Sequence, residues 1–305
     1  MKSNIFICAS FCLLTCNLHL IAAKTLFQTQ RTDPTILQAT IDGITIFGTQ
    51  PPQEKIYFHE QTPAQNAGEI LDHYSANSER WYADQCKGNH VLNDLVDTAI
   101  NFFTDHMPTN PQTQHQRLIV FDIDETLLSP YHLIYQYLLT KDKTALINRK
   151  TIVTYAAPLE MTLIYPMYRL YKFFCEKGFK IAVISGRPAS PQGILATKEQ
   201  LAENGFHQID EYFLRPVDWM AGKEWPACEW KTDALHQLNQ KYDVYTVIDD
   251  DWRSLTRLTP GTFGIWVPGY FEHWPQEEEF WAKLQDTYNE QNNKANTEKL
   301  EHPSS

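Results

Sequence analysis

Five short apolar runs that alternate with helix-length segments constrain the fold of this chain more than any other feature. The runs lie at residues 118–121, 180–184, 212–214, 244–248 and 263–267. Apolar residues recur at helical spacing over 166–176, 194–204 and 232–242, between the runs. Continuous short apolar runs joined by helices are typical of parallel strands that are covered on both faces. We therefore predict an α/β fold with a doubly wound parallel sheet.

The rest of the chain adds helices and a tail to this sheet. Helical spacing between residues 66 and 106 predicts two or three N-terminal helices, and one strand is expected at Ile41 to Phe47. We divide the chain into a signal peptide at 1–23, a leading segment at 24–65, the main domain at 66–275 and a tail at 276–305. The tail is expected to begin as a helix and to end polar and partly disordered. A small helical insertion at 130–165 is too short for a large mobile cap, which predicts an open site with broad specificity.

The first 23 residues have the pattern of a secretory signal. Lys2 supplies the positive start, Ile5–Leu14 is apolar, and small residues stand at 22 and 23. The apolar run is shorter than the roughly 20 residues that a membrane span needs. We therefore expect cleavage and a secreted or periplasmic protein with no stable membrane span. The alternatives are an uncleaved anchor and a lipid anchor at Cys16, although Thr15 is larger than the residue usually found before a lipidated cysteine.

Charge and cysteine content exclude several other functions. The chain has 26 basic and 37 acidic residues, a formal charge of -11, and no basic run longer than a pair. This composition argues against a nucleic-acid-binding surface and against binding to anionic membranes. Three of the six cysteines lie in the predicted signal, and Cys86, Cys175 and Cys228 form neither a disulfide framework nor a zinc motif.

Two aspartates follow the first apolar run directly, in the stretch FDIDETLLS. In an open parallel sheet, ligands bind at the carboxyl ends of the strands, so Asp122 and Asp124 are expected at a binding edge. A carboxylate there can attack phosphorus, and a second one two residues on can donate a proton to the leaving oxygen. Because both groups are anionic, a divalent cation is needed to bring a phosphate ester to them.

Three further polar stretches stand at predicted strand or helix ends. Ser185, Gly186 and Arg187 follow the second run, and a hydroxyl, turn amides and a guanidinium all suit phosphate oxygens. Lys231 opens a predicted helix, where its ammonium can neutralise further charge. Asp249–Asp251 follow the next run, and three adjacent carboxylates favour a metal site over a simple turn.

Taken together, FDIDETLLS, ISGRP, EWKTDAL and VIDDDW resemble the four motifs of the haloacid-dehalogenase superfamily, in the right order. They are most similar to its secreted, nearly capless acid phosphatases, a class that includes bacterial surface acid phosphatases and plant vegetative storage proteins. The resemblance covers about residues 66–268. It implies magnesium-dependent hydrolysis of small phosphomonoesters through an aspartyl-phosphate intermediate.

The resemblance also implies a role for each motif residue. Asp122 is the nucleophile and Asp124 the general acid and base. Mg²⁺ is held by Asp122, the backbone carbonyl of Asp124 and a fourth-motif aspartate, which alignment on Trp252 places at Asp250. The residues implied to bind the phosphoryl group or to steady its loop are Thr126, Ser185, Gly186, Arg187 and Lys231.

The sequence departs from the family pattern in two places, which leaves alternatives open. Asp249 replaces the usual glycine, and Ser254 replaces a second acidic residue, so Asp251 or Asp249 is a candidate to restore that charge. Asp124 argues against a dehalogenase, because a halide leaves without a proton. A phosphotransferase would use the same residues. A non-catalytic storage or binding protein is the alternative from a different class, and the intact Asp122 argues against it.

Overall fold

The computed structural model describes residues 36–49, 90–107, 117–129, 161–217, 227–267, 269 and 275–301. All of these belong to one compact unit that runs from Ile36 to Ser305. The predicted signal peptide, the helices expected before residue 90 and most of the insertion lie outside the described residues. No helix in the described ranges is both long and apolar enough to cross a membrane.

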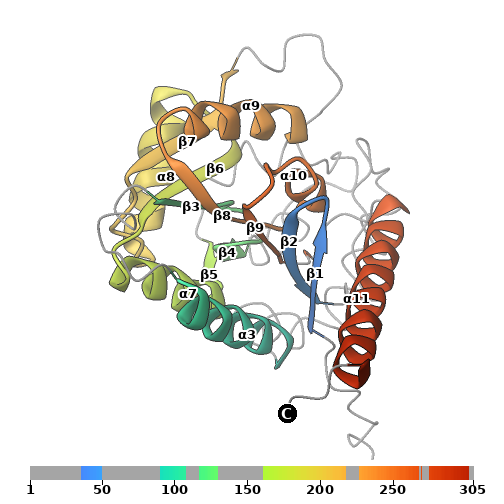
Figure 1. Ribbon diagram of the computed structural model, residues 1–305. Coiled ribbons are helices and arrows are strands. Elements are labelled where there is room, and N and C mark those ends of the chain that lie inside the picture. Colours follow the sequence, from blue (N-terminus) through green and yellow to red (C-terminus); the bar gives the residue numbers. More distant parts are fainter. Residues whose placement is uncertain are drawn as a thin grey trace, which may run out of the picture. The chain divides into compact units, whose positions relative to one another are not determined.

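The centre of the unit is a seven-stranded sheet with the order β1-β2-β9-β8-β3-β6-β7 (Figure 1). Its strands are β1 (Ile36–Ile41), β2 (Ile44–Thr49), β3 (Arg117–Phe121), β6 (Lys180–Pro188), β7 (Glu211–Arg215), β8 (Asp243–Asp249) and β9 (Phe263–Trp266). Every neighbouring pair is parallel except β1 and β2, which form an antiparallel hairpin. β4 (Leu128–Ser129) and β5 (Thr162–Leu163) pair separately. The predicted doubly wound α/β fold is therefore confirmed.

Successive residues of each strand point to opposite sides of the sheet. Because both sides are apolar, helices cover both faces. Ile119 and Phe121 of β3 pack in one core cluster with α3 (His90–His106), α7 (Tyr165–Glu176) and α8 (Pro191–Glu203). Leu118 and Val120 pack in a second cluster with α9 (Ala227–Asn239), α10 (Trp252–Leu255) and α11 (Pro275–Glu301). Figure 1 shows α3 and α7 on one side of the sheet and α9 on the other. Each fully buried large apolar side chain contributes roughly 1.5–3 kcal/mol to this core.

The N-terminal strand prediction was incomplete, since the structure has a hairpin where the sequence analysis expected one strand. β1 and β2 are joined by Asp42 and Gly43, which have φ angles of 52° and 81°. An Asp-Gly pair favours this left-handed geometry, and it is the usual signal of a two-residue hairpin turn. β2 then pairs in parallel with β9, so a part of the segment between residues 24 and 65 belongs to the sheet. The domain boundaries themselves stay predictions.

Two other elements, α11 and β6, can be compared with the expectation. The tail begins as a helix, as expected, and this helix is continuous over residues 275–301. α11 is anchored by Phe280 and Leu284, both buried, and the ring of Phe280 lies 5.3 Å from that of Trp266. β6 runs on to Pro188, so Ser185 to Pro188 form an irregular strand end and not a turn.

Candidate active site

The loop that follows β3 places two carboxylates at the carboxyl edge of the sheet. The backbone N–H of Asp122 donates to a carbonyl of β8 at 2.9 Å, which extends the pairing of these strands by one residue. The chain then turns tightly, because the N–H groups of Leu127 and Leu128 both donate to the carbonyl of Ile123, at 2.8 and 2.9 Å. Asp124 lies on this turn, so its side chain and that of Asp122 are held at one edge of the sheet.

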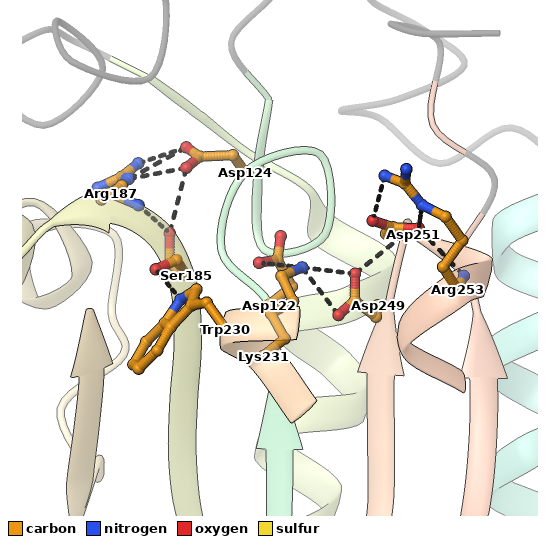
Figure 2. A network of polar contacts seen from close by, with 9 residues as sticks. All are labelled: Asp122, Asp124, Ser185, Arg187, Trp230, Lys231, Asp249, Asp251 and Arg253. Atoms are coloured by element: carbon orange, nitrogen blue, oxygen red, sulfur yellow. Dashed lines mark hydrogen bonds and ion pairs between the residues drawn. The ribbon is translucent and has the colours of Figure 1, made fainter. Parts of the chain in front are cut away.

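Lys231 of α9 joins Asp122 and Asp249 in a buried ion-pair network (Figure 2). Its Nζ lies 2.9 Å from Oδ1 of Asp122 and 2.8 Å from each carboxylate oxygen of Asp249. The three side chains are only 4% to 6% exposed. Figure 2 shows the second carboxylate oxygen of Asp122 pointing away from the lysine. Asp122 therefore has one carboxylate oxygen beside the ammonium of Lys231 and a second oxygen that points away from it.

Burial raises the pKa of the aspartates in this network, whereas the ion pairs decide the pKa of Lys231. Burial raises the pKa of Asp122 to about 7, Lys231 opposes the rise, and Asp249 and Asp124 add to it. Burial also raises the pKa of Asp249 against the effect of Lys231. The pKa of Asp250 lies well above its usual value because of burial and the charges of Asp122 and Glu125. Burial alone would lower the pKa of Lys231, but the attraction of Asp122 and Asp249 outweighs it and raises that pKa.

Asp122, Asp249 and Asp250 form a carboxylate cluster that fits a divalent cation. Each offers one oxygen, and these oxygens all lie within 4.8 Å of one another. Mg²⁺ and Ca²⁺ prefer oxygen ligands of this kind. Lys231 neutralises only one of the three charges, and carboxylates held so closely repel one another unless a cation lies among them. The raised pKa values of Asp122 and Asp250 are the consequence of burial and of that repulsion.

Asp251, which the sequence analysis gave as a possible metal ligand, is engaged elsewhere. Its carboxylate accepts hydrogen bonds from Nε and Nη2 of Arg253, at 2.8 and 2.7 Å. It also caps α10 by accepting from the backbone N–H of Arg253 at 3.0 Å. Its own backbone N–H donates to Oδ1 of Asp249 at 2.9 Å. Asp251 therefore orders the fourth-motif loop, while Asp249 joins the carboxylate cluster.

Glu125 and Gly269 also lie at the site, and the sequence analysis assigned neither a role. Glu125 is buried and has a φ of 65°, which non-glycine residues rarely adopt. A Cβ atom on Gly269 would lie 2.8 Å from Oε2 of Glu125 and 3.3 Å from Oδ2 of Asp250. Residue 269 therefore has no space for a side chain unless these two carboxylates move. A Glu in a loop and a Gly after the last strand carry no sequence signal that would have found this contact.

Asp124 lies on the other side of Asp122, where it contacts Ser185 and Arg187 at the end of β6. The register of β6 against β7 shifts between Ser185 and Pro188, which takes the intervening residues out of the regular ladder. Such irregularities redirect side chains at the edge of a sheet. Nη2 of Arg187 lies 2.7 Å from Oδ1 of Asp124, so Arg187 contacts a carboxylate where the sequence analysis expected a phosphate.

The remaining predicted residues occupy different positions around this edge. The Oγ atom of Ser185 accepts from the backbone N–H of Arg187 at 3.2 Å and donates to Asp124 at 3.4 Å. The carbonyl of Gly186 accepts from Nε of Arg215 at 2.9 Å. The hydroxyl of Thr126 is buried and makes no hydrogen bond with any described residue, so no such bond steadies the loop here.

Comparison with known protein families finds a match over most of the chain. Residues 53–288 match the family described as HAD superfamily, subfamily IIIB (acid phosphatase). Among curated proteins, no sequence matches. Among solved structures, the class C acid phosphatase from Bacillus anthracis has 15% identity and a TM-score of 0.47, over 75% of this chain and 98% of that one. The structure of class C acid phosphatase from Bacillus anthracis with tungstate bound has 16% identity and a TM-score of 0.44, over 79% of this chain and 97% of that one.

A chain of the Pnkp1/Rnl/Hen1 RNA repair complex is also similar, with 19% identity and a TM-score of 0.37. That similarity covers 52% of this chain and 44% of the other, so this chain spans less than half of that relative.

The fold, the edge-bound carboxylates with their lysine, and the family match define an α/β enzyme that hydrolyses phosphate monoesters. Within that class, the chain belongs to the acid phosphatases of the HAD superfamily, subfamily IIIB.

Proposed function

We propose that this phosphatase is magnesium-dependent and works through an aspartyl phosphate on Asp122. The observation that carries the proposal is the environment of that side chain. Asp122 stands at the carboxyl edge of the sheet, 2.9 Å from an ammonium and within a cluster of three carboxylates. A buried carboxylate with a cation on one side and a second oxygen pointing away from it suits nucleophilic attack.

In the first step, a carboxylate oxygen of Asp122 attacks phosphorus and the bond from phosphorus to the ester oxygen breaks. Asp124 gives its proton to the departing oxygen, so the alcohol leaves neutral. Lys231 and Ser185 hold the phosphoryl oxygens, since both lie beside the two aspartates and carry donor hydrogens.

In the second step, Asp124 takes a proton from water, which attacks the phosphoryl group on Asp122. The acyl phosphate bond breaks, inorganic phosphate leaves, and Asp122 is restored as a carboxylate. Asp124 ends this step protonated, as it began the first, so one residue serves both halves of the reaction.

Asp122, Asp249 and Asp250 are the side chains that would hold Mg²⁺. The bound cation offsets the charge of the phosphate ester and of the carboxylates that meet it. Asp249 stands where the family pattern has glycine, and it supplies the carboxylate that Ser254 lacks. Lys231 contacts Asp122 and Asp249 together, which fixes the spacing of two of the three ligands.

The substrate is a small phosphomonoester, and we propose broad specificity because the insertion at 130–165 is too short for a large cap. We also propose export through the predicted signal at 1–23, so that the mature protein acts in a periplasm or outside the cell.

Hydrolysis of 4-nitrophenyl phosphate tests the proposal, with and without a chelator, for the native protein and for Asp122→Asn. Asn keeps the shape of the side chain but has no anionic oxygen to attack phosphorus. We expect activity that requires metal and is lost in the variant. Native activity in Asp122→Asn, or full activity of the native protein in the presence of the chelator, would rule out the mechanism.

A further inference from the structure

Arg187 is fully buried, and its guanidinium makes its charged contact with Asp124. Nη2 lies 2.7 Å from Oδ1 of Asp124, and Nε lies 3.1 Å from Oδ1 and 3.0 Å from Oδ2. The arginine side chain is 0% exposed, whereas that of Asp124 is 20% exposed. Nη2 also lies 3.0 Å from the sulfur of Met161. The guanidinium therefore lies between the partly exposed carboxylate of Asp124 and the buried side chain of Met161.

The two oxygens of Asp124 have different partners. Oδ1 accepts from both Nε and Nη2 of Arg187, so its acceptor positions are occupied by the guanidinium. Oδ2 shares the Nε donor at 3.0 Å, and its other hydrogen bond within the described residues is the long one from the hydroxyl of Ser185, at 3.4 Å. Of the two, Oδ2 retains the capacity to carry a proton, and it faces the residue proposed to hold the phosphoryl group.

We propose that Arg187 is a positioning residue, which locks the side chain of Asp124 so that Oδ2 delivers the proton to the leaving oxygen. The inference rests on the proposed function of Asp124 as general acid and base. A planar guanidinium that binds a carboxylate through two N–H groups fixes its orientation as well as its place. The irregular register between Ser185 and Pro188 is what turns Arg187 toward Asp124.

The competing role for Arg187 is direct binding of the phosphoryl group, which the sequence alone favoured. The geometry opposes it, because the guanidinium has no exposed surface. Its remaining nitrogen, Nη1, is buried as well. A phosphate oxygen would reach Arg187 only after Asp124 and its neighbours had moved aside.

The two roles predict different dependences on the leaving group. A general acid matters most when the departing oxygen is a poor leaving group and little when the oxygen leaves readily as an anion. A phosphate-binding group matters equally for all esters. The test compares kcat/KM for the phosphates of 2,4-dinitrophenol, phenol and a simple alcohol, in the native protein, Arg187→Met and Arg187→Lys. This parameter reports the first irreversible step, in which the leaving group departs.

For Arg187→Met we expect a loss on the order of 100-fold with the alkyl phosphate, since acid–base catalysis contributes roughly 10²–10⁴-fold and displacement of the acid removes part of it. With the dinitrophenyl ester the loss should be at most a few-fold. Arg187→Lys keeps a cation beside Asp124 but not the two-point contact, so it should fall between the native protein and Arg187→Met with the alkyl ester.

Arg253 offers the matched control, because it holds Asp251 through the same Nε and Nη2 atoms at the neighbouring loop. Arg253→Met should change kcat/KM by the same factor for every ester. An equal loss for every ester in Arg187→Met would overturn the positioning role. Failure of the proposed function looks different, because Asp124→Asn itself would then lose kcat/KM by the same factor for every ester, whatever Arg187 does.

Discussion

Replacement of Lys231 by methionine should destabilise the folded protein by a large and pH-dependent amount. The substitution keeps an unbranched side chain only one atom shorter but leaves Asp122 and Asp249 buried side by side without their shared cation. Removal of one partner from a buried ion pair costs about 3–5 kcal/mol. For a domain of this size, each kcal/mol lowers Tm by roughly 2–4 °C, so the expected fall is roughly 6–20 °C at neutral pH without metal.

The pH dependence follows from the direction of the pKa shifts. Burial raises the pKa of Asp122 from 3.8 in the unfolded chain to about 7, with Lys231 opposing and Asp249 and Asp124 adding to the rise. Loss of the lysine removes the opposing effect and raises this pKa further. A carboxyl group with a raised pKa favours the folded state below the unfolded pKa and loses that effect as the pH rises through the folded pKa. Lys231→Met should therefore be nearest to the native Tm at about pH 4 and furthest from it above about pH 7.

The assay is thermal unfolding in the presence of a chelator, from about pH 4 to above about pH 7. Lys241→Met is the control. Lys241 also pairs with a carboxylate, that of Glu211, but its side chain is 62% exposed. Exposed ion pairs contribute about 0–1 kcal/mol, so the control should stay close to the native Tm at every pH. Equal effects of the two substitutions, or a fall for Lys231→Met that does not change with pH, would refute the reasoning.

Three further outcomes follow from the carboxylate cluster. Asp249→Asn and Asp250→Asn should raise the Mg²⁺ concentration needed for half-maximal activity, with the larger rise for Asp250→Asn. Asp251→Asn should raise that concentration least. A larger rise for Asp251→Asn than for the other two would contradict the assignment of the cluster. Gly269→Ala should also raise the Mg²⁺ requirement, because its Cβ would displace Glu125 or Asp250, while circular dichroism shows an unchanged fold. Mg²⁺ should increase Tm more at about pH 8 than at about pH 5, since protons compete with the cation for carboxylates of raised pKa, and a shift independent of pH would contradict this competition.

The alternation of apolar runs and helices was sufficient to predict the sheet, because parallel strands covered on both faces must be continuously apolar. It was also sufficient to bring Asp122 and Lys231 to one edge, since the carboxyl ends of parallel strands and the N-terminal turns of the helices that follow them share that edge. The hairpin at residues 36–49 was missed although Asp42-Gly43 is a recognised turn signal. The length of α11 could not be predicted from its few apolar residues, although its Glu, Lys and Gln residues favour a helix as far as Glu301.

The partners of the site residues could not be predicted in the same way. Three adjacent aspartates give no sequence signal for which one faces the cluster. That choice depends on β8 extending through Asp249 and on Arg253 binding Asp251. Likewise, the contact of Arg187 with Asp124 depends on the shifted register between β6 and β7, which is a property of the paired strands and not of either sequence. Residue types were predictable, whereas their pairing required tertiary structure.

The most direct test of the mechanism is detection of the covalent intermediate. The protein is mixed with 4-nitrophenyl phosphate and Mg²⁺, quenched during turnover and reduced with borohydride, which converts an aspartyl phosphate to homoserine. Peptide mass spectrometry then locates the change. We predict homoserine at position 122 in the native protein and none in Asp122→Asn. Modification at another residue, or turnover by the native protein without any trapped intermediate, would contradict the central role of Asp122.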